Sequence, residues 1–361
     1  MTSIRKPVPY ANRRSLEILA LGAVAFASPA ISSAMADPVA DFYKGRNLNW
    51  ILSAGSGGGY ASYARTFAPH FGKYIPGNPN IVIQHMPGGG GIRASNFLYS
   101  IAPKDGSTIG LVHSSVPFAP LYGIKAAAFD PRKFNWIGSI ATALTMCVSW
   151  RKSGVTSIKD LYEPGKFMVG GTGAGSQMET LPALLNQLIG TKIRIISGYK
   201  GGNNVYLAME KGEVNGRCGG LVSSINSTRP EWFSKNMVAV PIVISMKRSK
   251  LFPDAPAAAE LIKDPKKRKV LQLALAPTGM DRPILAPPGV PAERIAALRA
   301  AFSKTMKDPG FLKDAARLKL ELDEVPGPEV AKIVAEAYDT PAEIVQTAKD
   351  AMKIGHKKKK K

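Results

Sequence analysis

The sequence predicts an α/β protein of two domains, and three observations indicate this fold class. The chain has 361 residues, about twice the length of a common domain. Short apolar segments alternate with segments of helical spacing, which is typical of parallel α/β sheets. Glycine-rich turns stand between several of these strands and helices, where ligands bind in open α/β sheets.

The first 36 residues have the pattern of an export signal. Residues 1–14 are basic and end in Arg13-Arg14, residues 18–31 are uncharged and mostly apolar, and residues 34–36 read Ala-Met-Ala. The apolar run is shorter than the roughly 20 residues that a membrane span needs. We therefore expect an exported protein that is cleaved after Ala36 and is soluble outside the cytoplasm. Sec and twin-arginine export both stay open, and a short amphipathic first helix is the alternative interpretation.

The elements after the signal follow the apolar spacing. Residues 47–54 (NLNWILSA) form a buried strand pattern, and the apolar positions of 60–74 recur at helical intervals. In the first half the sequence predicts strands at 47–54, 81–85 and 108–113, and helices at 60–74 and 94–101. Further on it predicts strands at 167–170, 193–197 and 238–245, and helices at 177–189, 205–211, 257–263, 269–275 and 292–307.

The distribution of these elements predicts two lobes. The helices after Ser245 have too few predicted strands for a sheet of their own, so they are expected to rejoin the first part of the chain. The expected lobes are 37–140 plus 246–355, and 141–245, with the chain crossing between them near residues 140 and 245. Residues 356–361 form a basic tail that we expect to be disordered and dispensable for ligand binding.

Charge and cysteine content exclude several classes. The formal net charge of +22 lies partly in the basic ends and is otherwise spread along the chain, with no zinc finger, basic zipper or aromatic RNA-binding motif. We therefore expect no nucleic-acid partner, no metal and no cofactor. In an oxidising compartment Cys147 and Cys218 could form a disulfide, and the sequence leaves their pairing open.

Four glycine-rich turns carry the functional argument. Backbone N–H groups and the positive dipole end at a helix start favour an anion, and glycine lets the backbone come close to it. The turns contain hydroxyls but almost no basic side chain, so a ligand carboxylate should be held without an obligatory Arg or Lys clamp. The turns are residues 55–59, 87–91, 171–176 and 199–203.

Enzyme motifs are missing from this pattern. The segment 173–176 has the wrong order for a nucleophile elbow, and no phosphate-binding GxxxxGK[ST] element occurs. His113 and Ser114 are neighbours on a predicted strand, so their side chains should point to opposite faces. We expect no enzyme, and a secreted hydrolase or transferase remains an alternative.

The ordered set of motifs resembles the Bug-type extracytoplasmic receptors of the tripartite tricarboxylate transporter family. The resemblance covers nearly the whole mature chain. It implies a type II-like, two-lobed periplasmic binding protein that closes in the manner of a Venus flytrap on a carboxylated ligand. The motifs are residues 53–60, 63–65, 86–91, 102–106, 170–176, 198–202, 209–216 and 285–291.

The resemblance also implies the ligand-binding residues. In two positions the chain departs from the family pattern, since Ala61 and Gln177 stand where Asp is common, which disfavours a ligand with an amino group. The implied first-lobe residues are Ser53, Ser56, Gly59, Tyr60, Gly90, Gly91, His113, Ser114 and Ser115. The implied second-lobe residues are Thr172, Gly175, Ser176, Gln177, Tyr199, Gly202 and Asn203.

The expected function is therefore that of a transport receptor. It would capture a small carboxylate between its lobes as a monomer and deliver it to the membrane subunits of a tripartite transporter. A periplasmic sensor for a signalling partner is the alternative with the same binding chemistry. The sequence leaves open which carboxylate is bound and how tightly.

Overall fold

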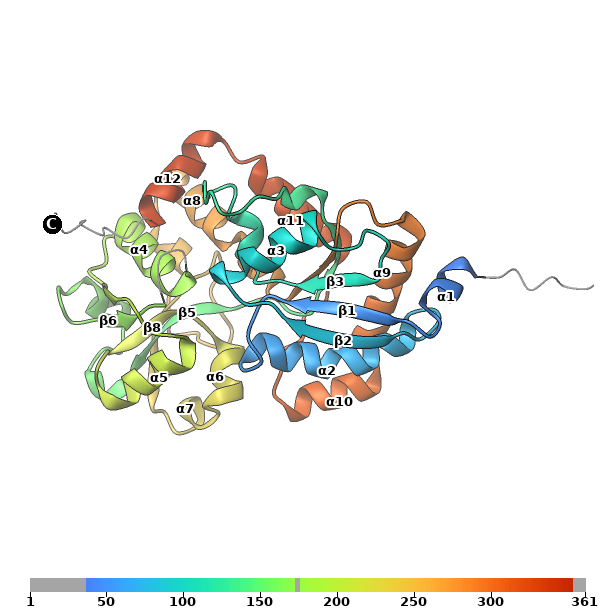
Figure 1. Ribbon diagram of the computed structural model, residues 1–361. Helices are drawn as coiled ribbons and strands as arrows, with labels where there is room; N and C mark the ends of the chain where they lie inside the picture. The colour runs from blue at the N-terminus through green and yellow to red at the C-terminus, as the bar shows by residue number, and fades with distance from the viewer. Residues whose placement is uncertain (1–36, 173–175, 353–361) are drawn as a thin grey trace, which may run out of the picture. The chain divides into compact units, whose positions relative to one another are not determined.

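The computed structural model describes residues 37–172 and 176–352, which form two β-sheets with helices packed on them (Figure 1). The expected export signal, the expected tail at 356–361 and Gly175 lie outside the described residues. No helix in the described ranges is both long and apolar enough to cross a membrane.

The first sheet has six strands in the order β11-β4-β10-β3-β1-β2. β1 pairs in parallel with β2 and β3, whereas β10 runs antiparallel between β3 and β4, and β11 runs antiparallel to β4. The sheet is therefore mixed rather than parallel throughout. Its strands are β1 (Asn47–Leu52), β2 (Asn80–His85), β3 (Thr108–Leu111), β4 (Asn135–Ser139), β10 (Pro283–Ala286) and β11 (Val325–Pro326).

The second sheet has five strands in the order β7-β6-β8-β5-β9. β6 pairs in parallel with β7 and β8, and β5 runs antiparallel to β8 and β9. Its strands are β5 (Thr145–Trp150), β6 (Met168–Gly170), β7 (Arg194–Ile196), β8 (Gly216–Leu221) and β9 (Val238–Val243).

The chain passes between the two sheets twice. It leaves the first sheet after β4 at Ser139 and enters the second at Thr145, and it leaves the second after Val243 and returns at Pro283. This confirms the expected double crossing. The lobe boundaries at 140/141 and 245/246 stay a prediction.

Helices cover both sheets. α2 packs on β2 and on α9 and α10, and α3 packs on β1 and β3. α4 and α5 both pack on β8. The helices are α1 (Pro38–Tyr43), α2 (Gly59–Tyr74), α3 (Ile92–Ser100), α4 (Gln177–Ile189), α5 (Gly202–Lys211), α6 (Val222–Thr228), α7 (Glu231–Ser234), α8 (Pro265–Leu275), α9 (Ala292–Met306), α10 (Pro309–Arg317), α11 (Gly327–Tyr338) and α12 (Ala342–Met352).

Aromatic side chains fill the core between the first sheet and α2. Trp50, Phe67 and Phe71 are fully buried. The ring centroids of Phe67 and Phe71 lie 5.3 Å apart. Their spacing of four residues places both rings on one face of α2. The helix continues through Pro69, so this packing outweighs the loss of one backbone hydrogen bond.

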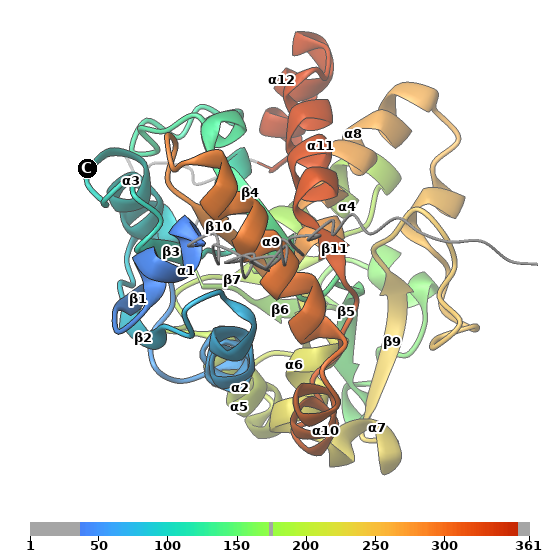
Figure 2. The same ribbon diagram turned by 90° about the vertical axis from the view of Figure 1, so that its right-hand side faces the viewer.

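The C-terminal helices also reach the second sheet. α12 and α8 pack against each other and against α4, which covers β8 (Figure 2). Buried Leu184, Val270 and Ala348 belong to one continuous hydrophobic cluster. The last part of the chain therefore contacts β4 of the first sheet through α11, and through α8 and α12 it contacts a helix that covers the second sheet.

Most of the predicted elements are present, and several unpredicted ones join them. The helix expected at 257–263 is only a short 3₁₀ helix, Ala258–Leu261, and the one expected at 269–275 begins earlier, at Pro265. The sequence did not predict the strands β4, β5, β8, β10 and β11, nor the helices α1, α6, α7, α10, α11 and α12.

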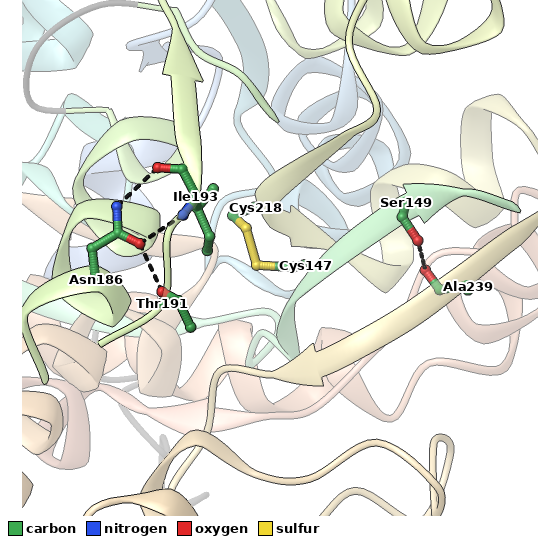
Figure 3. The surroundings of a disulfide bond; sticks show 7 residues. All are labelled: Cys147, Ser149, Asn186, Thr191, Ile193, Cys218 and Ala239. Carbon is green, nitrogen blue, oxygen red and sulfur yellow. Dashed lines mark hydrogen bonds between the residues drawn. A yellow bond between two sulfur atoms is a disulfide. The ribbon is translucent and has the colours of Figure 1, made fainter. Parts of the chain in front are cut away.

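Cys147 and Cys218 form a disulfide, which answers the question that the sequence left open (Figure 3). Cys147 lies in β5 and Cys218 in β8, and these strands are antiparallel neighbours in the second sheet. Both cysteines are fully buried, so the bond lies within the packed core.

Candidate functional site

The first group of expected site residues gathers where β1 and β3 end. The backbone N–H of His113 donates to Ser53 Oγ at 3.0 Å, and Ser53 Oγ lies 3.1 Å from His113 Nδ1. The Tyr60 hydroxyl donates to the carbonyl of Asp281 at 2.8 Å and accepts from the backbone N–H of Ser114 at 3.1 Å. These bonds fix the two turns against the start of α2.

Arg282 lies within this group, although sequence reasoning missed it. Its guanidinium pairs with the carboxylate of Asp281 and lies 4.2 Å from the ring centroid of Tyr60 and 4.6 Å from that of Tyr63. Arg282 is 1% exposed. A Cβ at position 59 would come within 3.3 Å of its Nη2, so Gly59 leaves room for the guanidinium.

His113 and Tyr60 are both neutral at pH 7. Burial, and then the positive charge of Arg282, lower the pKa of His113 to about 4. Burial raises the pKa of Tyr60 to about 12. Burial also raises the pKa of Asp281, and the adjacent charge of Arg282 opposes that shift. The one buried cation of this group thus has its counter-ion beside it.

The turn of residues 88–91 lies directly against Ser53 and His113. Gly91 has a φ of +104°, and a Cβ there would lie 2.9 Å from His113 Nδ1 and 3.2 Å from Ser53 Oγ. Only glycine combines this backbone conformation with so close an approach. Gly90, in the same turn, also has a positive φ, of +65°.

Ser56 and Ser115 lie at the edge of this group. Ser56 is exposed on the turn before α2, and its carbonyl accepts from the Arg65 guanidinium at 2.7 Å. Ser115 is partly exposed just before the 3₁₀ helix Val116–Phe118. The structure thus brings the other first-lobe residues together and leaves these two further out.

The second group lies on the second sheet, where β6 and β7 end. The Gly171 backbone N–H donates to the Ile196 carbonyl at 2.8 Å, and the Gly171 carbonyl accepts from the N–H groups of Gly198 and Tyr199, both at 3.1 Å. The turns after the two strands are therefore held together. Thr172 follows this junction and is partly exposed.

The start of α4 carries two more of the expected residues. Ser176 precedes the helix and Gln177 is its first residue, and both are partly exposed. Within the described ranges the Ser176 hydroxyl is a buried oxygen with no hydrogen-bond partner.

The start of α5 holds Gly202 and Asn203, together with a second buried arginine that sequence reasoning missed as a site residue. The Arg217 guanidinium lies 4.8 Å from the ring centroid of Tyr206. A Cβ at position 202 would come within 2.5 Å of its Nη1, so the guanidinium lies against the first turn of α5. Arg217 is 8% exposed, whereas Asn203 is exposed.

Helices at the two groups begin without a side-chain cap. α2, α3, α4 and α5 each lack a side-chain hydrogen bond to their first turn. Of the other helices, α1, α8 and α10 begin with an aspartate whose carboxylate accepts from the first turn, namely Asp37, Asp264 and Asp308, whereas α7, α9 and α11 also begin without a side-chain cap. The free N–H groups at α2, α3, α4 and α5 can instead donate to an oxygen of a ligand.

The hydrogen-bonded pair of Ser53 and His113 lies in the interior of the first group. Ser53 and His113 are hydrogen-bonded as in a nucleophile and base pair, but Ser53 is 1% exposed, which leaves its Oγ no open side for a substrate. Within the described residues, no cluster of three or more His, Cys, Asp or Glu side chains could hold a metal ion.

Comparison with known proteins places this fold and these motifs in one family. The model of the tripartite tricarboxylate transporter family receptors matches residues 73–349. Among curated proteins, none matches the chain.

Three solved structures share the fold. BugD, a periplasmic binding protein, is 20% identical with a TM-score of 0.64, covering 85% of this chain and 98% of BugD. MatC from Rhodopseudomonas palustris with bound malate is 18% identical with a TM-score of 0.61, covering 85% and 99%. An R. palustris protein with adipate is 18% identical with a TM-score of 0.63, covering 84% and 97%. Since the family model spans most of the chain, the protein belongs to the receptors of the tripartite tricarboxylate transporter family.

Proposed function

We propose that this chain is a periplasmic solute-binding protein that captures a small carboxylated ligand between two lobes and delivers it to the membrane subunits of a tripartite transporter. The observation that carries the proposal is the set of uncapped helix starts at glycine-rich turns, α2 and α3 on the first sheet and α4 and α5 on the second. The relatives with malate and adipate support a carboxylate as the ligand.

In this proposal the first group holds one ligand carboxylate through backbone N–H groups. The charge of Arg282 is neutralised by Asp281, so this arginine stabilises the turns without contacting the ligand. The lobes are 37–140 plus 246–355, and 141–245, and closure of these lobes around a monomer encloses the ligand. The chain is exported by the Sec or the twin-arginine route, cleaved after Ala36, and acts in the periplasm, the location of this family's receptors.

Titration calorimetry with malate and adipate tests the proposal, with glucose as the neutral control. Micromolar binding corresponds to about 8 kcal/mol and is expected for at least one dicarboxylate. Gly58→Val should abolish it, because a branched side chain stands before the first turn of α2.

Gly154→Val is the matched control for this variant. Gly58 and Gly154 have φ values of +97° and +77°, and a Cβ at either position meets no atom within 4 Å. Both substitutions therefore strain the backbone similarly, but Gly154 follows a 3₁₀ helix away from the helix starts. Equal binding by both variants, or no binding of any carboxylate by the unaltered protein, would contradict the proposal.

A further inference from the structure

The outward face of α3 is apolar, whereas the outward face of a surface helix is usually polar. The inner face packs on the first sheet through Ala94 and Leu98, which are buried. Ile92 and Phe97 lie on the other side of the helix and are partly exposed. Ile101, directly after the helix, is 72% exposed, more than any other large apolar side chain of the described residues. Exposed apolar side chains that lie together mark interaction sites.

A groove of about 560 Å³ lies along this face of α3. Asn96 fixes the neighbouring segment beside it, because its Nδ2 donates to the Ala126 carbonyl at 2.9 Å and its Oδ1 accepts from the Ala128 N–H at 3.0 Å. The groove is therefore built into the fold by hydrogen bonds. We call it the α3 groove, and its lining includes Met86, Ile92, Arg93, Phe97, Ile101 and Ala126.

The α3 groove joins apolar walls to positive charge. Arg93 lines it and is exposed, and no acidic side chain lines it in the part of the chain that the structure describes. Lys125, next to Ala126, is also exposed. Aromatic residues, methionine and arginine are enriched in the centres of protein interfaces, and a guanidinium can donate two parallel hydrogen bonds to a carboxylate. The groove is thus complementary to an apolar segment that carries a carboxylate.

The α3 groove also shares a turn with the first group of site residues. Gly89 lines the groove, and a Cβ at Gly88 would lie 3.3 Å from Arg93 Cδ. Further along the same turn, a Cβ at Gly91 would lie 2.9 Å from His113 Nδ1. A partner in the groove would therefore contact the segment that holds the ligand carboxylate in the proposed function.

We propose that the α3 groove docks a membrane subunit of the transporter, through a segment of that subunit that carries apolar side chains and a carboxylate. The apolar side chains pack against Phe97 and Ile101, and the carboxylate pairs with Arg93. A lipid surface fits less well, because its attraction depends on clusters of about four to eight cationic side chains. This inference rests on the proposed function, since a membrane partner is part of it.

The test measures binding of the receptor to the membrane subunits of its transporter in nanodiscs, by biolayer interferometry. The unaltered protein should bind. Arg93→Glu should weaken binding at least about tenfold, because it replaces a charge-assisted hydrogen bond by repulsion between two carboxylates. Ile101→Glu should also weaken binding, because it places a charge against the apolar segment.

Leu251→Glu and Lys313→Glu are the matched controls. Leu251 is 65% exposed in the loop after β9, and Lys313 is exposed on α10, and neither lines the α3 groove. Both variants should bind the nanodiscs as the unaltered protein does. Arg93→Gln, which removes the charge without reversing it, is the second variant if Arg93→Glu does not fold.

The inference is wrong if the unaltered protein does not bind the nanodiscs, or if the groove variants bind as tightly as the controls. Equal binding to nanodiscs that contain phosphatidylglycerol but no subunits would indicate a lipid partner instead. A dimer that is seen by light scattering and is lost in Ile101→Glu would place a second copy of this chain in the groove, which also overturns the inference.

Titration calorimetry with malate and adipate separates this inference from the proposed function. Ile101→Glu should bind the dicarboxylate as the unaltered protein does, because Ile101 lies outside the first group. If a carboxylate binds but the groove variants dock normally, only this inference fails. If no carboxylate binds but Arg93→Glu loses docking, ligand capture fails and the docking groove stands.

Discussion

The protein buries two arginines at its glycine-rich turns, and their surroundings differ. Arg282 pairs with Asp281 and lies against the rings of Tyr60 and Tyr63, whereas Arg217 lies against the ring of Tyr206 and has no carboxylate partner among the described residues. A buried charge that is fully paired stabilises the local structure only while its partner is present. The comparison indicates that internal partners hold the first-sheet turns, and that a buried guanidinium on the second sheet has no such partner among the described residues.

The largest effect should come from removing the counter-ion of Arg282. Asp281→Asn leaves the buried guanidinium unpaired and should lower the free energy of unfolding by about 3–5 kcal/mol, measured by urea denaturation. Glu343→Gln is the control, because it breaks the exposed pair with Lys266 and should cost under about 1 kcal/mol. If both variants lost a similar free energy of unfolding, the buried pair of Asp281 and Arg282 would stabilise the protein no more than an exposed pair does.

The free energy of unfolding should decrease in acid, because His113 is buried next to Arg282 and stays unprotonated in the folded protein. The pKa of His113 is about 4 in the folded protein and about 6.5 in the unfolded chain, so below pH 6.5 only the unfolded chain takes up the proton. Stability should therefore fall as the pH drops from 6.5 to 4, with about 3 kcal/mol from this residue. His113→Asn should show a shallower loss in urea denaturation over that window, and parallel curves would refute the assignment.

The Tyr60 hydroxyl links the Arg282 segment to the turn after β3. Tyr60→Phe leaves the Asp281 carbonyl and the Ser114 N–H without this partner, and should cost about 2 kcal/mol of unfolding free energy. Tyr162→Phe, at a side chain that is largely exposed, should change the same quantity by less than about 0.5 kcal/mol. If Tyr60→Phe left the free energy of unfolding unchanged, the two hydrogen bonds of the Tyr60 hydroxyl would not stabilise the turns.

The smallest effect on stability should come from Arg217. Arg217→Met removes a buried charge that has no carboxylate partner within the part of the chain that the structure describes, so the free energy of unfolding should change by less than about 1 kcal/mol or increase. Arg282→Met should cost several times more, since it leaves Asp281 buried without its cation. If the two methionine variants lost equal stability in urea, the contrast between the arginines would be wrong.

The sequence predicted the parts of the site that depend on local pattern. Runs of glycine identified the turns at 55–59 and 87–91, and the apolar segment before each turn identified β1 and β2. The hydrogen bond between Tyr60 and Asp281 joins residues 221 positions apart. No local sequence pattern predicts such a contact. Arg282 was missed for this reason, because its role depends on a partner from the other end of the chain.

The missed strands have a related explanation. β8 contains Gly216, Gly219 and Gly220, and glycine normally weakens a strand prediction. The structure requires at least one of them, since a Cβ at Gly216 would lie 2.5 Å from Cε2 of Phe167. Tertiary packing thus selected a residue that local propensity disfavours. Because β8 was not recognised, Arg217 could not be placed beside α5.

The disulfide has a consequence for protease resistance. Cys147 and Cys218 are 71 positions apart, and the segment between them contains both glycine-rich turns of the second sheet. A protease that cuts either turn there leaves two fragments that are still covalently joined. The turns at 55–59 and 87–91 lie outside this loop, so a single cut in either of them releases a free N-terminal fragment. The receptor's second-sheet turns can therefore be nicked without dividing the molecule.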